Sequence, residues 1–126
     1  MTTAPFEQTV CFYHTKALDK THQFYHETLG LPMALDQGAC RIYRVSTNGF
    51  IGFCTHREPV DPNGVIITLA TTDVETVYAA LQKKGVVFEK ALGFNPRFNI
   101  TNAFIRDPNG YLVEIQRFED PNWIVD

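Results

Sequence analysis

The sequence predicts an α+β fold in a single domain, built from two copies of a module with the order strand, helix, three strands (βαβββ). Two observations lead to this prediction. The same order of strand and helix patterns occurs twice along the chain. The two copies also align with nearly constant separation: Ala17 matches Asp73 at the starts of the helices, and Asn48 matches Asn109 in the last hairpins.

The first module covers about residues 6–56. It begins with a strand, because the segment from Phe6 to Thr15 is rich in β-branched and aromatic side chains. A helix over about 18–29 follows, since apolar residues recur near helical spacing and Gly30 offers a left-handed cap. Three short strands complete the module, at about Met33–Leu35, Cys40–Val45 and Phe50–Thr55.

The second module covers about residues 64–118 and follows a turn-rich linker. Val65–Ala70 predicts a strand. The segment Thr72-Asp73-Val74-Glu75 resembles a capping box at the start of a helix that ends at Gly85. The remaining expected elements are a strand at Val86–Lys90, a loop at Leu92–Asn99, a strand at Ile100–Arg106, a last strand after the turn at 107–110, and a C-terminal tail at 119–126.

The segment Asp107-Pro108-Asn109-Gly110 predicts a tight hairpin turn, because proline fixes φ at the second position and glycine accepts a left-handed fourth position. Side chains alternate in the strand that follows. Tyr111, Val113 and Ile115 lie on one face, and Leu112, Glu114 and Gln116 lie on the other. If a helix covers the first face, the carboxylate of Glu114 faces the opposite side of the sheet.

Composition excludes several classes of partner. Of the 126 residues, 44% are hydrophobic and 20% are charged, and the net charge is −3 without any basic stripe. We therefore expect a globular protein that does not bind nucleic acid. Apolar runs such as Val65-Ile66-Ile67 are too short to cross a bilayer, so no membrane association is expected. Residues 1–5 lack the pattern of a signal peptide, which favours a cytoplasmic location.

The chain contains three cysteines, Cys11, Cys40 and Cys54, an odd number without close spacing. A disulfide framework is therefore not expected, and no C-x-x-C motif for metal or redox chemistry is present. Buried, reduced thiols are the expected state.

Two motifs resemble a known family. The segment from Leu18 to Leu31 is similar to LxxxxxFYxxxLGL, and the segment from Arg106 to Glu114 is similar to RDPxGxxxE. Both motifs are those of the vicinal oxygen chelate superfamily, which includes glyoxalase I, extradiol dioxygenases, and fosfomycin- and bleomycin-resistance proteins. The resemblance covers almost the whole chain. It implies that each module forms a curved mixed sheet with its helix on the convex side, and that the paired modules enclose a cavity between their concave faces.

The resemblance also implies ligand positions for a divalent metal ion on the first and last strands of each module. In this chain these positions hold Val10, Phe53, Ile66 and Glu114, and only Glu114 has a ligand atom. One carboxylate cannot replace the hydration shell of a divalent ion, so we expect no metal and no other cofactor. The alternative is one divalent metal ion in a rebuilt site around Glu114 and His14.

Strand alternation and the repeat together predict which side chains line the concave faces. The predicted lining consists of Val10, Phe12, His14, Arg41, Tyr43, Ile51, Phe53, Ile66, Thr68, Asn102, Phe104, Leu112, Glu114 and Gln116. This largely apolar and aromatic set suits a small organic ligand. A register change of one residue would reverse the assignment for a strand.

The candidate ligand-binding residues are His14, Arg41, Tyr43, Phe53, Phe104 and Glu114. Glu114 is either an acceptor, base or metal anchor, or a carboxylate satisfied by Arg41, Tyr43 or water. Arg41 can bind a ligand carboxylate or phosphate, or can be solvated. The three aromatic residues can stack on a ligand or fill a closed interior. His14 can exchange protons or remain a rim residue, and in an enzyme it would be catalytic together with Glu114.

These patterns favour a binding protein of the bleomycin-resistance type that holds a small apolar or aromatic molecule without a metal. One alternative is a metal-dependent lyase, isomerase or dioxygenase. Another is a structural or regulatory domain that acts through its surfaces. Open strand edges further predict a homodimer.

Overall fold

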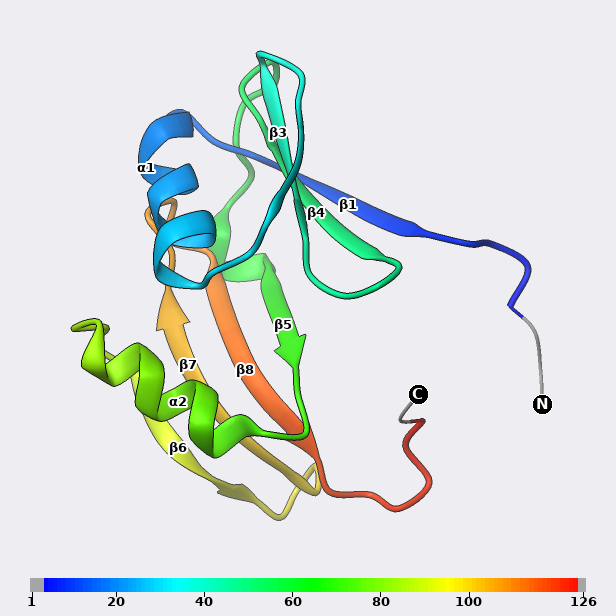
Figure 1. Ribbon diagram of the computed structural model, residues 1–126. Helices are drawn as coiled ribbons and strands as arrows, with labels where there is room; N and C mark the ends of the chain where they lie inside the picture. Colours follow the sequence, from blue (N-terminus) through cyan, green and yellow to red (C-terminus); the bar gives the residue numbers. More distant parts are fainter. Residues whose placement is uncertain (1–3, 125–126) are drawn as a thin grey trace. The chain divides into compact units, whose positions relative to one another are not determined.

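The computed structural model describes residues 4–124. The first three residues of the N-terminal segment and the last two of the predicted tail therefore lie outside the described residues. The chain divides into two compact units, Met1–Asp61 and Pro62–Asp126. Each unit contains one four-stranded mixed sheet and one main helical segment in the order strand, helix, three strands, so the predicted pair of βαβββ modules is confirmed (Figure 1).

The first unit is built around a sheet with the strand order β1-β4-β3-β2. Strands β1 and β4 are parallel, and the other neighbours are antiparallel. Its elements are β1 (Thr9–His14), α1 (Leu18–His22), the π-helical turn η1 (Gln23–Thr28), β2 (Met33–Asp36), β3 (Cys40–Arg44) and β4 (Gly49–Cys54). The helical segment stops before Gly30, whose φ of 78° provides the predicted left-handed cap.

The second unit repeats this topology with the strand order β5-β8-β7-β6, and β5 is parallel to β8. Its elements are η2 (Pro62–Gly64), β5 (Ile66–Ala70), α2 (Val74–Lys83), β6 (Lys90–Asn95), β7 (Ile100–Arg106) and β8 (Leu112–Phe118). The turn at 107–110 joins β7 to β8 as predicted, and Gly110 has a φ of 85°. No helix within residues 4–124 is both long enough and apolar enough to span a membrane.

Two local predictions in the second unit are wrong. The strand expected at 86–90 begins only at Lys90 and runs through the predicted loop to Asn95, because a bulge and Gly93 interrupt its alternation. The capping box is also absent, since Asp73 makes no side-chain cap bond. Its backbone N–H instead donates to Oγ1 of Thr71 at 3.2 Å, and Glu75 accepts a bond from Arg117.

The core of the first unit is aromatic. Tyr25, Tyr43 and Phe53 are each fully buried. The ring of Tyr25, from the helical segment, lies 4.4 Å from that of Phe53 on β4, measured between centroids. The helical segment therefore covers the face of the sheet that carries Tyr43 and Phe53, and burying these rings stabilises the unit by several kcal/mol, at about 1.5–3 kcal/mol for each large side chain.

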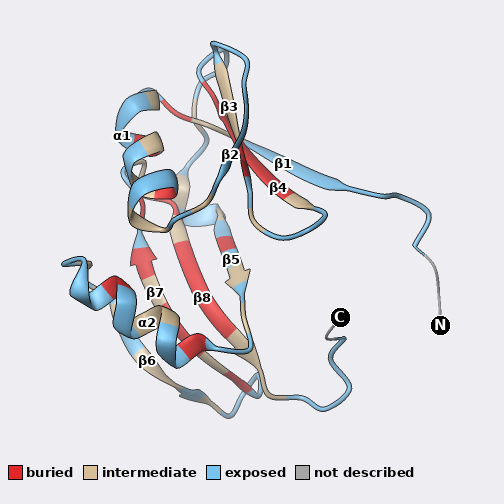
Figure 2. Cartoon of the chain, viewed as in Figure 1, coloured by how far each residue is buried: buried red, intermediate tan, exposed pale blue. Residues whose placement is uncertain are grey.

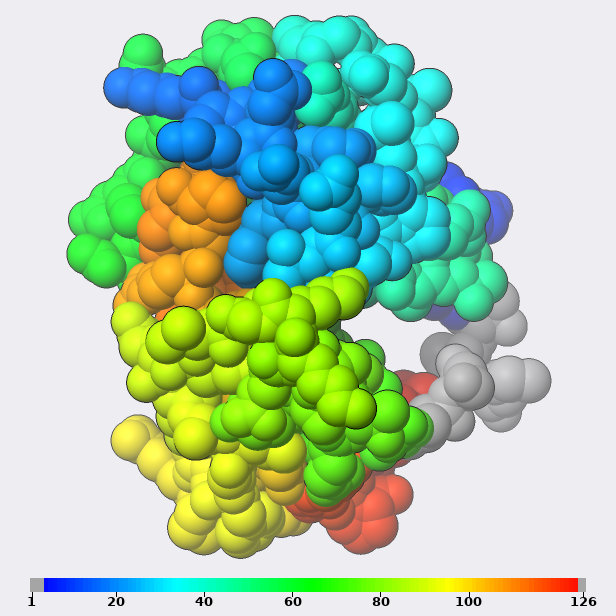
Figure 3. Space-filling view, turned by 60° about the vertical axis from the view of Figure 1, so that its left-hand side comes forward, coloured from blue at the N-terminus to red at the C-terminus, as the bar shows by residue number. Residues whose placement is uncertain are grey.

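The core of the second unit is mainly aliphatic and lies between α2 and the face of β7 and β8 that the helix covers (Figure 2). Val74 and Leu81 of α2 are buried. The sheet contributes Ala103, Ile105, Val113 and Ile115, all at most 2% exposed. The outer face of α2 is exposed and carries Glu75, Thr76, Gln82 and Lys83 beside two alanines. The helix forms part of the yellow-green surface in Figure 3. Because strand side chains alternate, Leu112, Glu114 and Gln116 lie on the face opposite the helix.

The strand registers show that the predicted alignment of the two modules is wrong by one position in β4. Phe12 pairs with Gly52 in the first sheet, and its counterpart Thr68 pairs with Glu114 in the second. Gly52 and not Phe53 is therefore the counterpart of Glu114. The physical reason is the first hairpin, in which the backbone N–H of Val45 donates to Gly49 as that of Asp107 does to Tyr111. Gly49 thus matches Tyr111, and every later position of β4 moves with it.

The prediction of reduced, buried thiols is also wrong. Cys40 and Cys54 form a disulfide, and Cys11 is free but exposed. The two bonded cysteines are far apart in the sequence but lie directly opposite each other on β3 and β4, with 4.1 Å between their Cα atoms. The pairing of the two strands thus brings the cysteines together, which their spacing in the sequence does not reveal.

Arg117 on β8 connects the second sheet to α2. Its Nη1 donates to Oε2 of Glu75 at 2.8 Å, and its Nη2 donates to Oε2 of Glu119 at 2.9 Å. The bonds from Arg117 hold the pKa values of the Glu75 and Glu119 carboxyls below their usual range, and Thr101 adds a bond to Glu119. These bonds also raise the pKa of Arg117.

The Arg117→Gln variant is expected to lose a stabilising contribution that depends on pH. A carboxyl whose pKa is lower in the folded state stabilises the fold above its unfolded pKa, and this contribution disappears as the pH falls through the folded pKa. The stability difference between wild type and variant should therefore be present at neutral pH and shrink below pH 4.5, the ordinary pKa of glutamate. Urea unfolding of both proteins at successively lower pH measures it. A difference that stays constant over this range would contradict the prediction.

Candidate functional site

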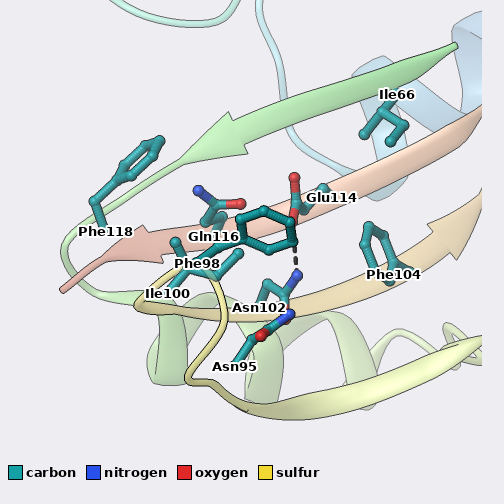
Figure 4. A pocket seen from close by; sticks show the side chains of 9 residues that line it. All are labelled: Ile66, Asn95, Phe98, Ile100, Asn102, Phe104, Glu114, Gln116 and Phe118. Carbon is teal, nitrogen blue, oxygen red and sulfur yellow. Dashed lines mark hydrogen bonds between the residues drawn. The ribbon is translucent and has the colours of Figure 1, made fainter. Parts of the chain in front are cut away.

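A hollow of about 590 Å³ lies on the face of the second sheet opposite α2 (Figure 4). Strands β5 to β8 and the β6–β7 turn supply its walls. Its lining side chains are Ile66, Asn95, Phe98, Ile100, Asn102, Phe104, Glu114, Gln116 and Phe118. Aromatic and aliphatic groups form most of this set, and Figure 4 shows the rings of Phe98, Phe104 and Phe118 arranged around the polar groups.

Glu114 lies among these polar groups and is only 9% exposed. Its Oε1 accepts a hydrogen bond from Thr68 Oγ1 at 2.7 Å, and its Oε2 accepts one from Asn102 Nδ2 at 2.6 Å. When the Gln116 amide is turned so that its nitrogen faces the carboxylate, that nitrogen lies 2.6 Å from Oε2 and 2.9 Å from Oε1. A buried carboxylate requires such donors, and the neighbouring strands β5 and β7 supply two of them.

Lys90 extends this network beyond the lining residues. Its Nζ donates to the side-chain oxygen of Asn102 at 2.9 Å and to the backbone oxygen of Asn102 at 3.0 Å. The amide of Asn102 thus connects a cation on β6 to the carboxylate of Glu114 on β8. This arrangement fixes the orientation of Asn102 and places a positive charge close to the buried acid.

The hydrogen bonds limit what Glu114 can do chemically. A carboxylate offers about four lone-pair positions, and the contacts from Thr68, Asn102 and Gln116 occupy most of them. The expected partners Arg41 and Tyr43 are not among its donors. Glu114 thus accepts hydrogen bonds from Thr68 and Asn102, and from Gln116 when its amide is turned.

Three of the predicted site residues lie on the other side of their sheet. Tyr43 and Phe53 belong to the aromatic core under the first helical segment. Arg41 also faces that segment, where its Nη1 lies 3.1 Å from Oδ1 of Asp19. Their predicted place on the concave face is wrong, because the first hairpin shifts the register of β4 and β3 by a single position. Ile51 is misplaced for the same reason.

The hydroxyl of Tyr43 contacts a side chain of the helical segment, whereas the sequence predicts that Tyr43 contacts a ligand. Its hydroxyl lies 2.8 Å from Nδ1 of His22, and burial raises the pKa of that hydroxyl. His26, one helical turn further on, bonds through Nδ1 to the backbone oxygen of Leu31 at 2.9 Å. The two histidines thus stabilise the helical segment.

The structure places the other predicted residues in two separate hollows. Phe104 and Glu114 line the one in the second unit. His14, on β1 of the first unit, lines a hollow of about 390 Å³ together with Phe12, Gln37, Cys40, Cys54, His56 and Arg57. Val10 and Ile66, at two of the family ligand positions, are exposed apolar side chains.

Sequence reasoning missed several residues of the larger hollow. Asn95 and Phe98 fall in the segment predicted as a loop. Lys90 does not line the hollow but contacts its lining residue Asn102, and the sequence places it at the end of a strand whereas it begins β6. Phe118 follows Glu114 and Gln116 at alternate positions, so strand periodicity continued along β8 would have included it. Its ring stacks on Trp123 at 3.8 Å between centroids, which places the described part of the tail beside this hollow.

Solved structures show the same fold at low sequence identity. An integron cassette protein from the mobile metagenome of a Halifax Harbour sewage outfall gives a TM-score of 0.74 at 22% identity, covering 88% of this chain and 97% of that one. TioX from Micromonospora sp. ML1 gives 0.73 at 17% identity, with 87% and 97% covered. Lactoylglutathione lyase from Agrobacterium tumefaciens gives 0.72 at 18% identity, with 90% and 95% covered.

These likenesses show the fold alone. No curated protein matches the sequence. The family model described as "Glyoxalase/Bleomycin resistance protein/Dioxygenase superfamily" matches residues 8–115. That match spans both βαβββ modules and includes the two motifs on which the predicted resemblance was based, so this chain belongs to the glyoxalase/bleomycin resistance protein/dioxygenase superfamily.

Proposed function

We propose that this protein binds a small, mainly apolar or aromatic molecule in the hollow of its second unit, without a metal ion at the ligand positions typical of the family. The observation that carries the proposal is the lining itself. Phenylalanine and isoleucine side chains surround a hollow large enough for a small organic molecule, and the buried acid within it is already satisfied.

The family metal positions do not suit a divalent ion in this chain. Val10, Gly52 and Ile66 have no ligand atom, and Gly52 takes the position first assigned to Phe53. Glu114 is the one remaining donor, and its oxygens accept bonds from neighbouring side chains. A divalent ion needs several ligands to replace its hydration shell. The same contacts argue against the alternative of an enzyme with a rebuilt metal site at Glu114.

Polar groups at the edge of the apolar lining would orient the ligand. The amide of Asn95 lines the hollow, and Gln116 retains a carbonyl oxygen when its nitrogen faces Glu114. A molecule with a flat apolar body and one hydrogen-bonding group would pack against the apolar lining and bond to one of these polar groups. Sequestration or transport of such a molecule requires no chemical step.

Binding of the neutral aromatic dye Nile red tests the proposal through a matched pair of charge substitutions. Ile66 lines the hollow and is 58% exposed, whereas Phe94 is 60% exposed on the opposite face of the same sheet. Ile66→Asp should weaken dye binding by about tenfold or more, because it places a charge against an apolar ligand. Phe94→Asp should leave dye binding at the wild-type level. Fluorescence titration measures both affinities.

Equal binding by wild type and the Ile66→Asp variant would overturn the proposal. Both positions are exposed, so neither substitution removes a core side chain, and circular dichroism checks that each variant is folded. Native mass spectrometry of freshly purified protein supplies a second readout, since it detects a retained small molecule, a metal ion and the oligomeric state together. Dimer formation and a cytoplasmic location stay predictions of the sequence.

A further inference from the structure

A second cluster of chemically active side chains belongs to the first unit, whereas the proposed ligand site belongs to the second. Among residues 4–124, one group of three metal-ligating side chains has its ligand atoms within 4.8 Å of one another: Cys40, Cys54 and His56. The Nδ1 atom of His56 lies 3.9 Å from Sγ of Cys40. Cys54 is buried, Cys40 is half-buried and His56 is exposed, so the cluster reaches from the sheet to the surface.

The fold brings these three residues together through strand pairing. Cys40 on β3 is directly opposite Cys54 on β4, and His56 follows shortly after Cys54 in the chain. The equivalent pair on β7 and β8 of the second unit is Asn102 and Gln116, which bind Glu114. The face opposite the helix thus carries a polar group in the second unit and a pair of cysteines in the first.

We propose that Cys40, Cys54 and His56 form a zinc site when the disulfide is reduced, and that the disulfide is the metal-free state of the same site. Two thiolates and one imidazole are a ligand set that favours zinc over magnesium or calcium. In the disulfide, each sulfur is bonded to the other and neither is a thiolate. Metal binding and disulfide formation therefore exclude each other.

The geometry of the cluster is close to what tetrahedral zinc requires. With typical bond lengths, two sulfur ligands are about 3.8 Å apart and a sulfur and a nitrogen ligand are about 3.6 Å apart. The observed distance of 3.9 Å between His56 Nδ1 and Cys40 Sγ is near the second value. Breaking the S–S bond lets the two sulfurs separate by side-chain rotation, without movement of β3 or β4.

Three protein ligands leave one coordination position of zinc for water or a bound molecule. This position would face the smaller hollow, which is also lined by Phe12, His14 and Gln37. The ring of His14 lies 5.5 Å from that of His56, measured between centroids. A polar ligand that enters this hollow would therefore meet both the metal and a neighbouring imidazole.

Reduction of the full-length protein followed by cobalt titration tests the proposal. Tris(2-carboxyethyl)phosphine and water break the Cys40–Cys54 bond: the phosphine becomes its oxide, and the sulfurs accept two electrons and two protons as thiols. After the reductant is removed without air, Co²⁺ replaces those two protons. Reduced wild type should bind one Co²⁺ per chain and show a thiolate-to-cobalt charge-transfer band that Zn²⁺ abolishes. Unreduced wild type should neither bind Co²⁺ at this site nor show the charge-transfer band.

Matched variants identify the ligands. Cys11→Ser removes the exposed cysteine outside the cluster and should leave the band unchanged. Cys54→Ser should abolish the band, and His56→Ala should weaken metal binding by about a hundredfold. Absence of the band in reduced wild type would overturn the proposal, as would equal metal binding by the Cys54→Ser variant. Circular dichroism checks that each variant is folded, so this test does not depend on the proposed function.

Discussion

The Phe53→Ala variant is expected to lower the free energy of unfolding by about 3–5 kcal/mol, because it removes a fully buried ring from the first unit. The ring of Phe53 contacts those of Tyr25 and Tyr13, with centroids 4.4 and 5.7 Å away. Truncation leaves a cavity that rigid aromatic neighbours fill poorly. Urea unfolding followed by circular dichroism measures the loss.

Phe12→Ala is the matched control, since it removes the same side chain from the opposite face of the same sheet. Phe12 is 49% exposed, so its loss should change stability by less than about 1 kcal/mol. The pair also tests the register of the first sheet. If Phe53 lined an open pocket, as strand alternation first predicted, the two variants would lose similar amounts of stability.

The Asp107→Ala variant is expected to lose about 2–3 kcal/mol through the turn between β7 and β8. Asp107 is 5% exposed, and its Oδ1 accepts hydrogen bonds from the backbone N–H groups of Asn109 and Tyr111, each at 2.8 Å. Alanine leaves both donors without that acceptor. The loss should appear in urea unfolding of the variant as a lower midpoint at an unchanged slope.

The Asp107→Asn variant tests whether the turn depends on the acceptor oxygen of Asp107 or on its negative charge. Asparagine keeps one side-chain oxygen in the position of Oδ1, so it should retain most of the stability that alanine loses. Equal losses in the two variants would mean that these backbone bonds do not hold the turn. The amide of Asn109 also donates to Oδ2 of Asp107 at 3.3 Å, and this weaker contact is the one that the asparagine variant gives up.

The second module was predictable from sequence because its signals are strong and agree with one another. The turn at 107–110 fixes the register of β8, and strand alternation then places Glu114 and Gln116 opposite the helix, as the structure shows. The same hairpin register also predicts correctly that Phe104, which pairs with Glu114, lies on the face opposite the helix. What the sequence did not reveal is the identity of the donors, since Thr68 and Asn102 reach Glu114 from other strands.

The first module was predictable in its elements but not in its faces. Sequence similarity aligns the Asn48-Gly49 pair with Asn109-Gly110, yet Gly49 takes the position of Tyr111 in the hairpin. A shift by a single position exchanges the two faces of a strand, so Arg41, Tyr43 and Phe53 were assigned to the wrong side. The disulfide escaped prediction for a related reason, since pairing between β3 and β4 depends on that same register.

The hydrogen-bonded group around Glu114 draws every described member from one half of the chain: Thr68, Lys90, Asn102 and Gln116. If the donors to Glu114 came from both units, a substitution in either unit would remove one of its hydrogen bonds. Here the acid and its donors form a self-contained set within the second unit. The matching positions of the first unit hold Cys40 and Cys54, which take no part in that set, so substitutions there leave its hydrogen bonds intact.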